Sequence, residues 1–348
     1  MIEVNLVFLF IVFFVMFFTL VSLFFYLMIQ KYMTNKKKKK IDQLKEAYRL
    51  DMFHFLQSGE DSKLRPDGSQ EKYIALIELL IEYAKVLESE DIKQRISVFA
   101  KKYLTDYIVG QLKRNRWSLR MNALYAIEDF YMIHLSANLH DLYEKKQLTL
   151  AEKFQILKLF AKFGDEKTIH YIRSVASSIS DFTLLSIFLL LEEDHFHNLV
   201  ENFSQLPERM QYMVIETIGK KQYLQYYSLL QNLLQSDEEE MRIRTLKTFA
   251  YTGAPVDEEI LADFFQSSSW QVRMMAAKLA GVKRLSQYAG QLVSMLSDQN
   301  YVVRSEAARA LLQFKYGANI LRNVIDESHD DFAKDMAREW LEKESTHE

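Results

Sequence analysis

The sequence predicts an all-α protein, a right-handed α-solenoid of helical hairpins that follows one transmembrane helix. Three observations lead to this fold class. Residues 6–29 form an apolar run of 24 residues near the N-terminus. Only three prolines and nine glycines occur among 348 residues, and so few helix breakers are typical of a nearly all-helical chain with short turns. A pattern of large apolar residues and arginines also recurs at intervals of about thirty residues, which indicates stacked helical repeats.

The apolar run predicts a membrane anchor at residues 1–35. It contains eight phenylalanines and no charged side chain, and as a helix it is about 36 Å long, enough to cross a hydrocarbon core of about 30 Å. A cleaved signal peptide would have a basic start, a shorter apolar stretch and small residues before the cleavage site, and this sequence has none of them. A buried core helix is the alternative to a membrane span.

A polybasic juxtamembrane segment occupies residues 36–40 and consists of Lys36, Lys37, Lys38, Lys39 and Lys40. Lys31 lies just before this segment, whereas Glu3 is the charged residue on the other side of the apolar run. The positive-inside rule therefore predicts a single-pass protein of the cell membrane with its C-terminal domain in the cytoplasm. We expect the five lysines to contact lipid headgroups without selecting a particular lipid. The alternative is that they recognise one anionic lipid specifically.

Composition argues against several classes of function. Residues 41–348 carry 38 basic and 46 acidic side chains, a net charge of −8, which argues against non-specific nucleic-acid binding. The absence of cysteine excludes disulfides, thiolate nucleophiles and cysteine-ligated metals. No phosphate-binding loop, dinucleotide fingerprint, zinc-protease pair or nucleophile elbow occurs, and the acidic and histidine residues at 192–197 fit a solvated helix end better than a metal site. The sequence therefore predicts no cofactor, no metal and no enzymatic activity.

Four segments share the recurring pattern. Each begins with a large apolar residue, at Trp117, Met241, Trp270 or Tyr301, and reaches an arginine three positions later, at Arg120, Arg244, Arg273 or Arg304. Alanines and leucines at helical spacing follow, and such small residues let neighbouring helices approach closely. Four glycines follow apolar stretches at positions where a glycine is expected to end a helix: Gly164, Gly219, Gly253 and Gly281.

This pattern resembles that of HEAT repeats, the helical hairpins that build armadillo-like α-solenoids. The resemblance is strongest over residues 237–315. It implies a HEAT-like repeat array over residues 113–348, with residues 41–112 as an N-terminal helical cap or divergent repeats. The amphipathic residues 331–341 are expected to close the last core, with Phe332 among the side chains that face inward.

In HEAT repeats an aspartate in the turn and an arginine in the second helix form a ladder that stabilises the stack. The resemblance implies a structural ladder made of Arg120, Asp237, Arg244, Arg273, Asp298 and Arg304. Its best pairs are Asp298 with Arg304 and Asp237 with Arg244. Arg273 lacks an acid in the turn before it, because three serines stand at residues 267–269. Trp117 and Trp270 recur with the same period and are expected in core packing rather than in a binding site.

These features predict a membrane-anchored cytoplasmic scaffold or accessory subunit that binds a partner protein, itself membrane-associated. Anchoring raises the effective concentration of a weak partner, and an integral membrane enzyme such as a polysaccharide-synthesising glycosyltransferase is one partner of this kind. Residue usage rich in Lys, Ile and Phe indicates a bacterial origin. Tyr223, Tyr226 and Tyr227 form an aromatic cluster that is either an interface or part of the core. A lyase-type enzyme with an unrecognised site and an anionic-lipid sensor are the alternative functions.

Overall fold

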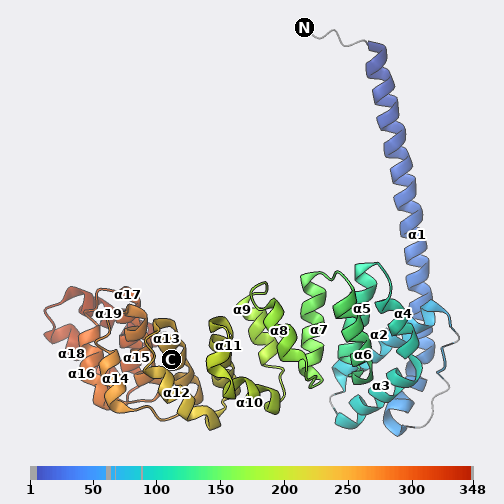
Figure 1. The fold of residues 1–348 in the computed structure, drawn as a ribbon. Coiled ribbons are helices and arrows are strands. Elements are labelled where there is room, and N and C mark those ends of the chain that lie inside the picture. The colour runs from blue at the N-terminus through green and yellow to red at the C-terminus, as the bar shows by residue number, and fades with distance from the viewer. Residues whose placement is uncertain (1–5, 60–63, 67, 88, 346–348) are drawn as a thin grey trace. The chain divides into compact units, whose positions relative to one another are not determined.

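The computed structural model describes residues 6–59, 64–66, 68–87 and 89–345, and within these ranges it contains helices and turns but no strand (Figure 1). This confirms the predicted fold class, an all-α chain of helical hairpins preceded by one apolar N-terminal helix. The chain divides into two compact units, Met1–Leu159 and Phe160–Glu348.

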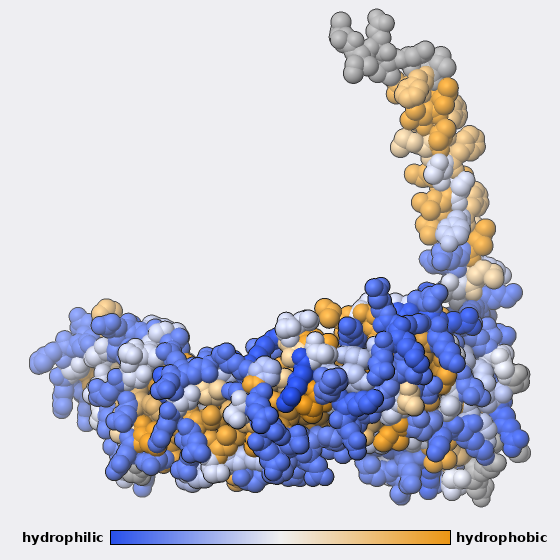
Figure 2. All heavy atoms as spheres, in the orientation of Figure 1, coloured by the Kyte–Doolittle hydropathy of each residue, from blue (hydrophilic) through white to orange (hydrophobic). Residues whose placement is uncertain are grey.

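The first unit begins with one continuous helix, α1 (Leu6–Ser58), of 53 residues. The apolar part of α1 is almost entirely exposed, and Figure 2 shows hydrophobic side chains around it. By length and composition this helix can span a membrane. The C-terminal part of α1 packs against α2 (Gln70–Val86) and α3 (Glu90–Tyr103) and fully buries Met52 and Leu56. The predicted anchor and the first helix of the folded unit are therefore one continuous helix.

Polar contacts hold α1 against its neighbours. Lys45 of α1 forms ion pairs with Glu78 (3.2 Å) and Glu82 (2.5 Å) of α2. At the end of α1, Arg95 of α3 donates a hydrogen bond of 2.6 Å to the main-chain carbonyl of Leu56. This carbonyl is one of the last four of the helix, which have no partner within it, so Arg95 caps the C-terminus of α1.

The rest of the first unit consists of α4 (Thr105–Leu112), α5 (Trp117–Asp129), a 3-10 turn at Ile133–Leu135, α6 (Ser136–Lys145) and the first ten residues of α7 (Leu150–Lys162). α4 packs against α5. α5 buries Leu124 and Ile127 completely, so the alanine- and leucine-rich stretch after Arg120 is core, as its helical spacing predicts.

The second unit is built of short helices. They are α8 (Thr168–Val175), α9 (Asp181–Phe188), α10 (Glu193–Glu201), α11 (Glu208–Lys221), α12 (Tyr227–Leu234), α13 (Glu239–Thr252), α14 (Glu258–Phe264), α15 (Trp270–Val282), α16 (Ala289–Met295), α17 (Tyr301–Leu312), α18 (Gly317–Glu327) and α19 (Asp331–Ser345), with 3-10 turns at Phe203–Gln205, Leu224–Tyr226 and Ser286–Tyr288. The helices α11, α13, α15, α17 and α19 contact one another in chain order, and α12, α14, α16 and α18 each pack against the helix that follows. We call α5, α7, α9, α11, α13, α15, α17 and α19 the second helices, because each is the later helix of a hairpin.

The glycines have two different roles in these hairpins. Gly164 and Gly253 follow their helices with positive φ angles of 64° and 68°, as expected for glycines that end a helix. Gly219 and Gly281 instead lie inside α11 and α15. A Cβ on Gly281 would come within 2.7 Å of Ala310 Cα, so this glycine permits close packing of α15 on α17. The sequence-based assignment of Gly219 and Gly281 to helix ends is therefore wrong.

Candidate interaction site: the arginine ladder

An arginine occupies the fourth position of four second helices. These residues are Arg120 in α5, Arg242 in α13, Arg273 in α15 and Arg304 in α17. Each donates from Nη1 to the main-chain carbonyl six residues earlier, which belongs to Arg114, Ser236, Ser267 or Asp298. The donor–acceptor distances are 3.0, 2.5, 2.7 and 2.7 Å. Each arginine thereby ties its helix to the turn that precedes it and satisfies a carbonyl outside regular structure.

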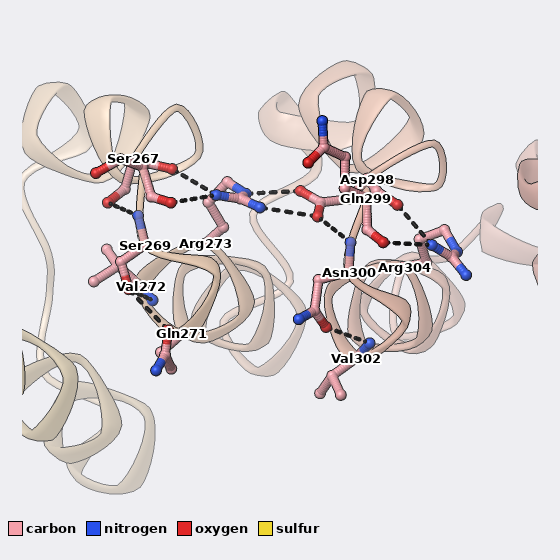
Figure 3. Close-up of polar contacts among 11 residues, drawn as sticks. Ser267, Ser269, Gln271, Val272, Arg273, Asp298, Gln299, Asn300, Val302 and Arg304 are labelled. Carbon is pink, nitrogen blue, oxygen red and sulfur yellow. Dashed lines mark hydrogen bonds and ion pairs between the residues drawn. The ribbon is translucent and has the colours of Figure 1, made fainter.

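Arg273 makes a second set of bonds to the next hairpin (Figure 3). Its Nε donates to Asp298 Oδ2 at 2.7 Å and its Nη2 to Asp298 Oδ1 at 2.9 Å, the bidentate geometry of a strong charge-assisted pair. Asp298 Oδ1 also accepts a 2.8 Å bond from the Asn300 amide. Burial opposes ionisation of Asp298, but the bonds from Arg273 and Asn300 outweigh it and hold its pKa below the usual value.

The expected pairing of Asp298 with Arg304 therefore differs from the arrangement found. Arg304 bonds the main-chain oxygen of Asp298, whereas the Asp298 carboxylate turns back to Arg273 of the preceding hairpin. Arg273, for which no acid was expected, bonds both the turn before its own helix and an acid of the next hairpin, and we call this pair of contacts a complete rung. The reason is geometric: the acid stands three residues before a second helix begins, where its side chain reaches the previous second helix.

Arg244 lies two residues after the fourth position of its helix, the position that the ladder arginines occupy. α13 begins at Glu239, so its fourth residue is Arg242, and the arginines at 242, 273 and 304 are spaced by 31 residues. Arg244 instead pairs with Glu216 and, at 2.6 Å, with Glu240. Among the described residues, no hydrogen bond or ion pair joins Arg244 to Asp237, the second pair that the resemblance implied. A register anchored on helix starts rather than on the first apolar residue would have found Arg242.

The first unit contains a buried ion pair between Arg120 and Glu152, which was not predicted from the sequence. Arg120 Nε donates to Glu152 Oε1 at 2.5 Å, and the two residues are only 8% and 0% exposed. Glu152 Oε2 accepts bonds from the amide (3.0 Å) and hydroxyl (2.9 Å) of Thr149, whose hydroxyl accepts from the Glu152 amide in return. This is a capping box, and its signature, Thr-x-x-Glu before an apolar run, is readable in the sequence. Burial opposes ionisation, but Arg120 and Thr149 hold the pKa of Glu152 below its usual value.

The aromatic residues that open the second helices are more exposed than expected. Trp117, Trp270 and Tyr301 are 48%, 37% and 51% exposed, so the expectation that Trp117 and Trp270 pack in the core does not fit their placement. Phe332, expected to face inward, is 67% exposed. The side chains at the first and second positions of these helices are largely exposed. The buried apolar face of each helix begins at the third position, as at Val272 and Val303.

The three tyrosines lie around the start of α12. Tyr226 is buried, with its ring centroid 5.7 Å from that of Phe196, and Tyr223 lies 5.4 Å from the same phenylalanine. Tyr227 makes a T-shaped contact with Phe249, centroid to centroid 6.0 Å. All three pack against neighbouring helices. An interface role for the half-buried Tyr223 and Tyr227 stays a prediction.

Chemically, the ladder can bind carboxylates and main-chain carbonyls. A polar groove of about 700 Å³ flanks the pair of Arg273 and Asp298 and is lined by these two residues together with serine and glutamine side chains. Within the described ranges, no group of three or more His, Cys, Asp or Glu residues is placed to hold a metal ion. Lys36 and Lys38–Lys40 are exposed and Lys37 is half-buried on α1, where the helix leaves the apolar run.

Adding the missing acid should complete a further rung. The residues that correspond to Asp298 are Ser267 before α15 and Ser236 before α13, and each accepts a bond from the amide two residues on, as Asp298 does. Ser267→Asp should pair with Arg242 and raise the free energy of unfolding by about 0.5–1.5 kcal/mol. Ser236→Asp is the matched control, because α11 has Gln211 at the fourth position, and it should give no gain. Thermal unfolding of the full chain checks both, and equal shifts would contradict the ladder register.

Comparison with known proteins agrees with the repeat architecture. Residues 258–342 match the family model for HEAT repeats. No curated protein matches the chain. Solved structures that match include human deoxyhypusine hydroxylase in complex with glycerol, at 14% identity over 70% of this chain and 96% of the hydroxylase with a TM-score of 0.28. Another is an engineered protein, at 16% identity over 88% of this chain and 98% of that protein with a TM-score of 0.36. The family match over residues 258–342 and the stacked hairpins of the described residues support a HEAT-like helical repeat protein.

The prediction that the protein has no enzymatic activity is corrected by the same comparison. Deoxyhypusine hydroxylase, which is an enzyme, is among the solved structures that match the chain. With a TM-score of 0.28, the match assigns no reaction to this chain. Function therefore has to be argued from the sites that the chain itself presents.

Proposed function

We propose that the protein is a membrane-anchored scaffold whose helical repeats lie in the cytoplasm and bind a membrane-associated protein. In this proposal residues 1–35 form the anchor, residues 36–40 contact the headgroups and residues 41–348 provide the binding surface. HEAT repeats generally mediate protein–protein interactions, and stacked hairpins offer the extended surface that such binding uses. The charge balance, with lysines on the C-terminal side of the apolar run, supports the cytoplasmic placement.

The observation that carries the proposal is the continuity of α1. The apolar run ends at Ile29, and Ile41 is the first buried residue of the folded part. The helix between them is unbroken, twelve residues correspond to about 18 Å of rise, and α2 already contacts its last turns through Gln70 on Lys37 (3.2 Å) and Glu71 on Lys40 (3.7 Å). A helix, unlike a flexible linker, holds the first unit at a fixed height above the headgroups. A partner that meets this unit must therefore itself lie near the membrane surface, as the cytoplasmic part of a membrane protein does.

Affinity purification from mild detergent tests the proposal. The full chain is compared with a variant whose residues 1–35 are replaced by an unrelated transmembrane helix. The new helix continues without a break into Lys36, so that the following residues keep their orientation. We expect the same membrane protein to co-purify with both, because the repeats carry the recognition. Loss of the partner in the anchor-swapped variant would place recognition in the apolar helix, and the absence of a defined partner in either sample would contradict the scaffold function.

A further inference from the structure

Every thirty-first residue from 208 to 332 is exposed and stands at the first or second position of a second helix. The first two are acidic and the next three are aromatic: Glu208 in α11, Glu239 in α13, Trp270 in α15, Tyr301 in α17 and Phe332 in α19. We call these five residues the period-31 edge. Their helices contact one another in chain order, and the buried face of each helix begins only at its third position. The five side chains therefore follow one another along the second unit without a role in its core.

The acidic end of the edge lacks a basic partner. The hydroxyl of Tyr212 contacts the carboxylates of Glu208 (2.5 Å) and of Glu238, the residue before α13. Glu239 accepts a 2.7 Å bond from the hydroxyl of Ser269, the residue before α15. Among the described residues, no lysine or arginine forms an ion pair with any of these three carboxylates. Burial and the neighbouring Glu208 carboxylate raise the pKa of Glu238, as expected where negative charge gathers without a cation.

The aromatic end continues the edge across two more helix contacts. Figure 3 shows the starts of α15 and α17 side by side, joined by Arg273 and Asp298. Arg304 Cζ lies 5.8 Å from the ring centroid of Tyr301 and 4.9 Å from that of Phe332, which joins α17 to α19. Because Arg304 already supplies positive charge at these rings, this end suits apolar side chains better than a further cation. Exposed aromatic residues are typical of the strongly contributing positions in protein interfaces.

The charge of the second unit favours a basic ligand. Residues 160–348 carry 20 basic and 28 acidic side chains, a net charge of −8, whereas residues 41–159 carry 18 of each. The negative excess of the folded part therefore lies entirely in the unit that contains the edge. Cytoplasmic segments next to membrane spans are rich in lysine and arginine, and a membrane protein is the class of partner that the scaffold proposal names. Complementary charge of this kind steers association and selects partners.

We propose that the period-31 edge, together with Glu238, binds a short extended segment of the partner protein. Basic side chains of this segment meet the acidic end, and its apolar side chains pack on the three aromatic residues. Packed helices lie about 8–10 Å apart, and three residues of polyproline-II chain rise about 9 Å. One side chain in three therefore meets each successive helix start. This inference rests on the proposed scaffold function and names the kind of segment that the scaffold binds.

The test is a fluorescence-anisotropy titration of the full chain in phosphatidylcholine nanodiscs. The probe is the labelled peptide Arg-Ala-Pro-Arg-Ala-Pro-Leu-Ala-Pro-Leu-Ala-Pro-Leu, which has a basic or apolar side chain at every third position. One control peptide has glutamine in place of both arginines, and the other alternates leucine and arginine at the same positions. We expect saturable binding of the probe and binding about tenfold weaker for each control peptide. No saturable binding of the probe, or binding of either control as strong as that of the probe, overturns the edge.

Matched variants separate the edge from the general charge of the unit. Glu208→Gln with Glu239→Gln should weaken binding of the probe about tenfold. Glu259→Gln with Asp326→Asn removes two exposed charges from α14 and α18 instead, and should leave binding unchanged. Equal weakening by the two double variants overturns the edge, because it would show only the attraction of an acidic protein for a basic peptide. Phe332→Ala, which removes no charge, should also weaken binding, and an unchanged affinity contradicts the aromatic end.

Co-purification distinguishes the edge from the scaffold function. Loss of the partner in Glu208→Gln with Glu239→Gln, but not in Glu259→Gln with Asp326→Asn, supports both. If the partner co-purifies with the edge variant as strongly as with the parent chain, the scaffold function stands and the edge is wrong. If no partner co-purifies with the parent chain, the scaffold function fails, and the peptide titration still decides whether the edge binds basic and apolar segments.

Discussion

Replacing Arg120 by leucine, or Glu152 by glutamine, should each lower the free energy of unfolding of the N-terminal unit by about 3–5 kcal/mol. The two side chains form a buried ion pair of 2.5 Å, and either change leaves an uncompensated charge at a site that is 8% or 0% exposed. Glutamine keeps the capping-box geometry with Thr149, so its effect isolates the charge. Thermal unfolding followed by circular dichroism on the full chain measures both.

A surface pair of the same unit provides the control. Lys145 and Asp141 lie 2.8 Å apart with side chains that are 71% and 66% exposed. Asp141→Asn should change the free energy of unfolding by less than about 1 kcal/mol, because water screens the pair. The double variant Arg120→Leu, Glu152→Leu should recover most of the loss, since it leaves no unpaired charge. Destabilisation by the double variant that equals the sum of the single ones would contradict a direct coupling.

Acid should act on the same pair. The folded-state pKa of Glu152 lies below its ordinary value of 4.5, so its contribution to stability is present above that value and is lost as the pH falls through the folded-state pKa. The parent chain should therefore lose more stability on acidification below about pH 4.5 than Glu152→Gln does.

Helical spacing and helix breakers were sufficient to predict the fold class. The alanines and leucines after Trp270 and Tyr301 form the buried faces of α15 and α17, and the apolar run is an exposed helix. These features follow from local periodicity, which a single sequence carries in full. The strong pattern of residues 237–315 also lies largely within the part of the chain, 258–342, that matches HEAT repeats.

The partners of the ladder could not be predicted in the same way. Two arginines at the fourth position of a second helix meet an acid far along the chain: Arg273 meets Asp298 after 25 residues, and Arg120 meets Glu152 after 32. Sequence proximity favoured Asp298 with Arg304, but the turn conformation decides which way the carboxylate points. The register error at Arg244 has a similar cause: Met241 resembles Trp270 in chemistry, yet α13 begins two residues before it, at Glu239. Helix starts depend on capping, which the apolar pattern does not report.

Gly281→Ala should lower the free energy of unfolding of the C-terminal unit by about 1–3 kcal/mol, even though alanine is the better helix former. A Cβ at this position meets Ala310 Cα and Cβ at 2.7 Å, and backbone atoms of α17 cannot move aside as a flexible side chain can. α15 and α17 would have to separate, which loosens contacts along the whole pair because interiors are close-packed. Because the ladder joins the same two hairpins, this separation should also lengthen the bonds between Arg273 and Asp298.

Gly290→Ala is the matched control for this prediction. Gly290 lies in α16, next to α15 and α17 in the chain, and no atom lies within 4 Å of a Cβ placed there. Alanine at this position should raise the free energy of unfolding by about 0.4–1 kcal/mol, because it reduces the freedom of the unfolded chain without adding a clash. Chemical denaturation of the full chain and of both variants measures whether each substitution lowers or raises the free energy of unfolding. Stabilisation by Gly281→Ala would show that α15 and α17 pack less closely than described, and the ladder geometry built on their spacing would then need revision.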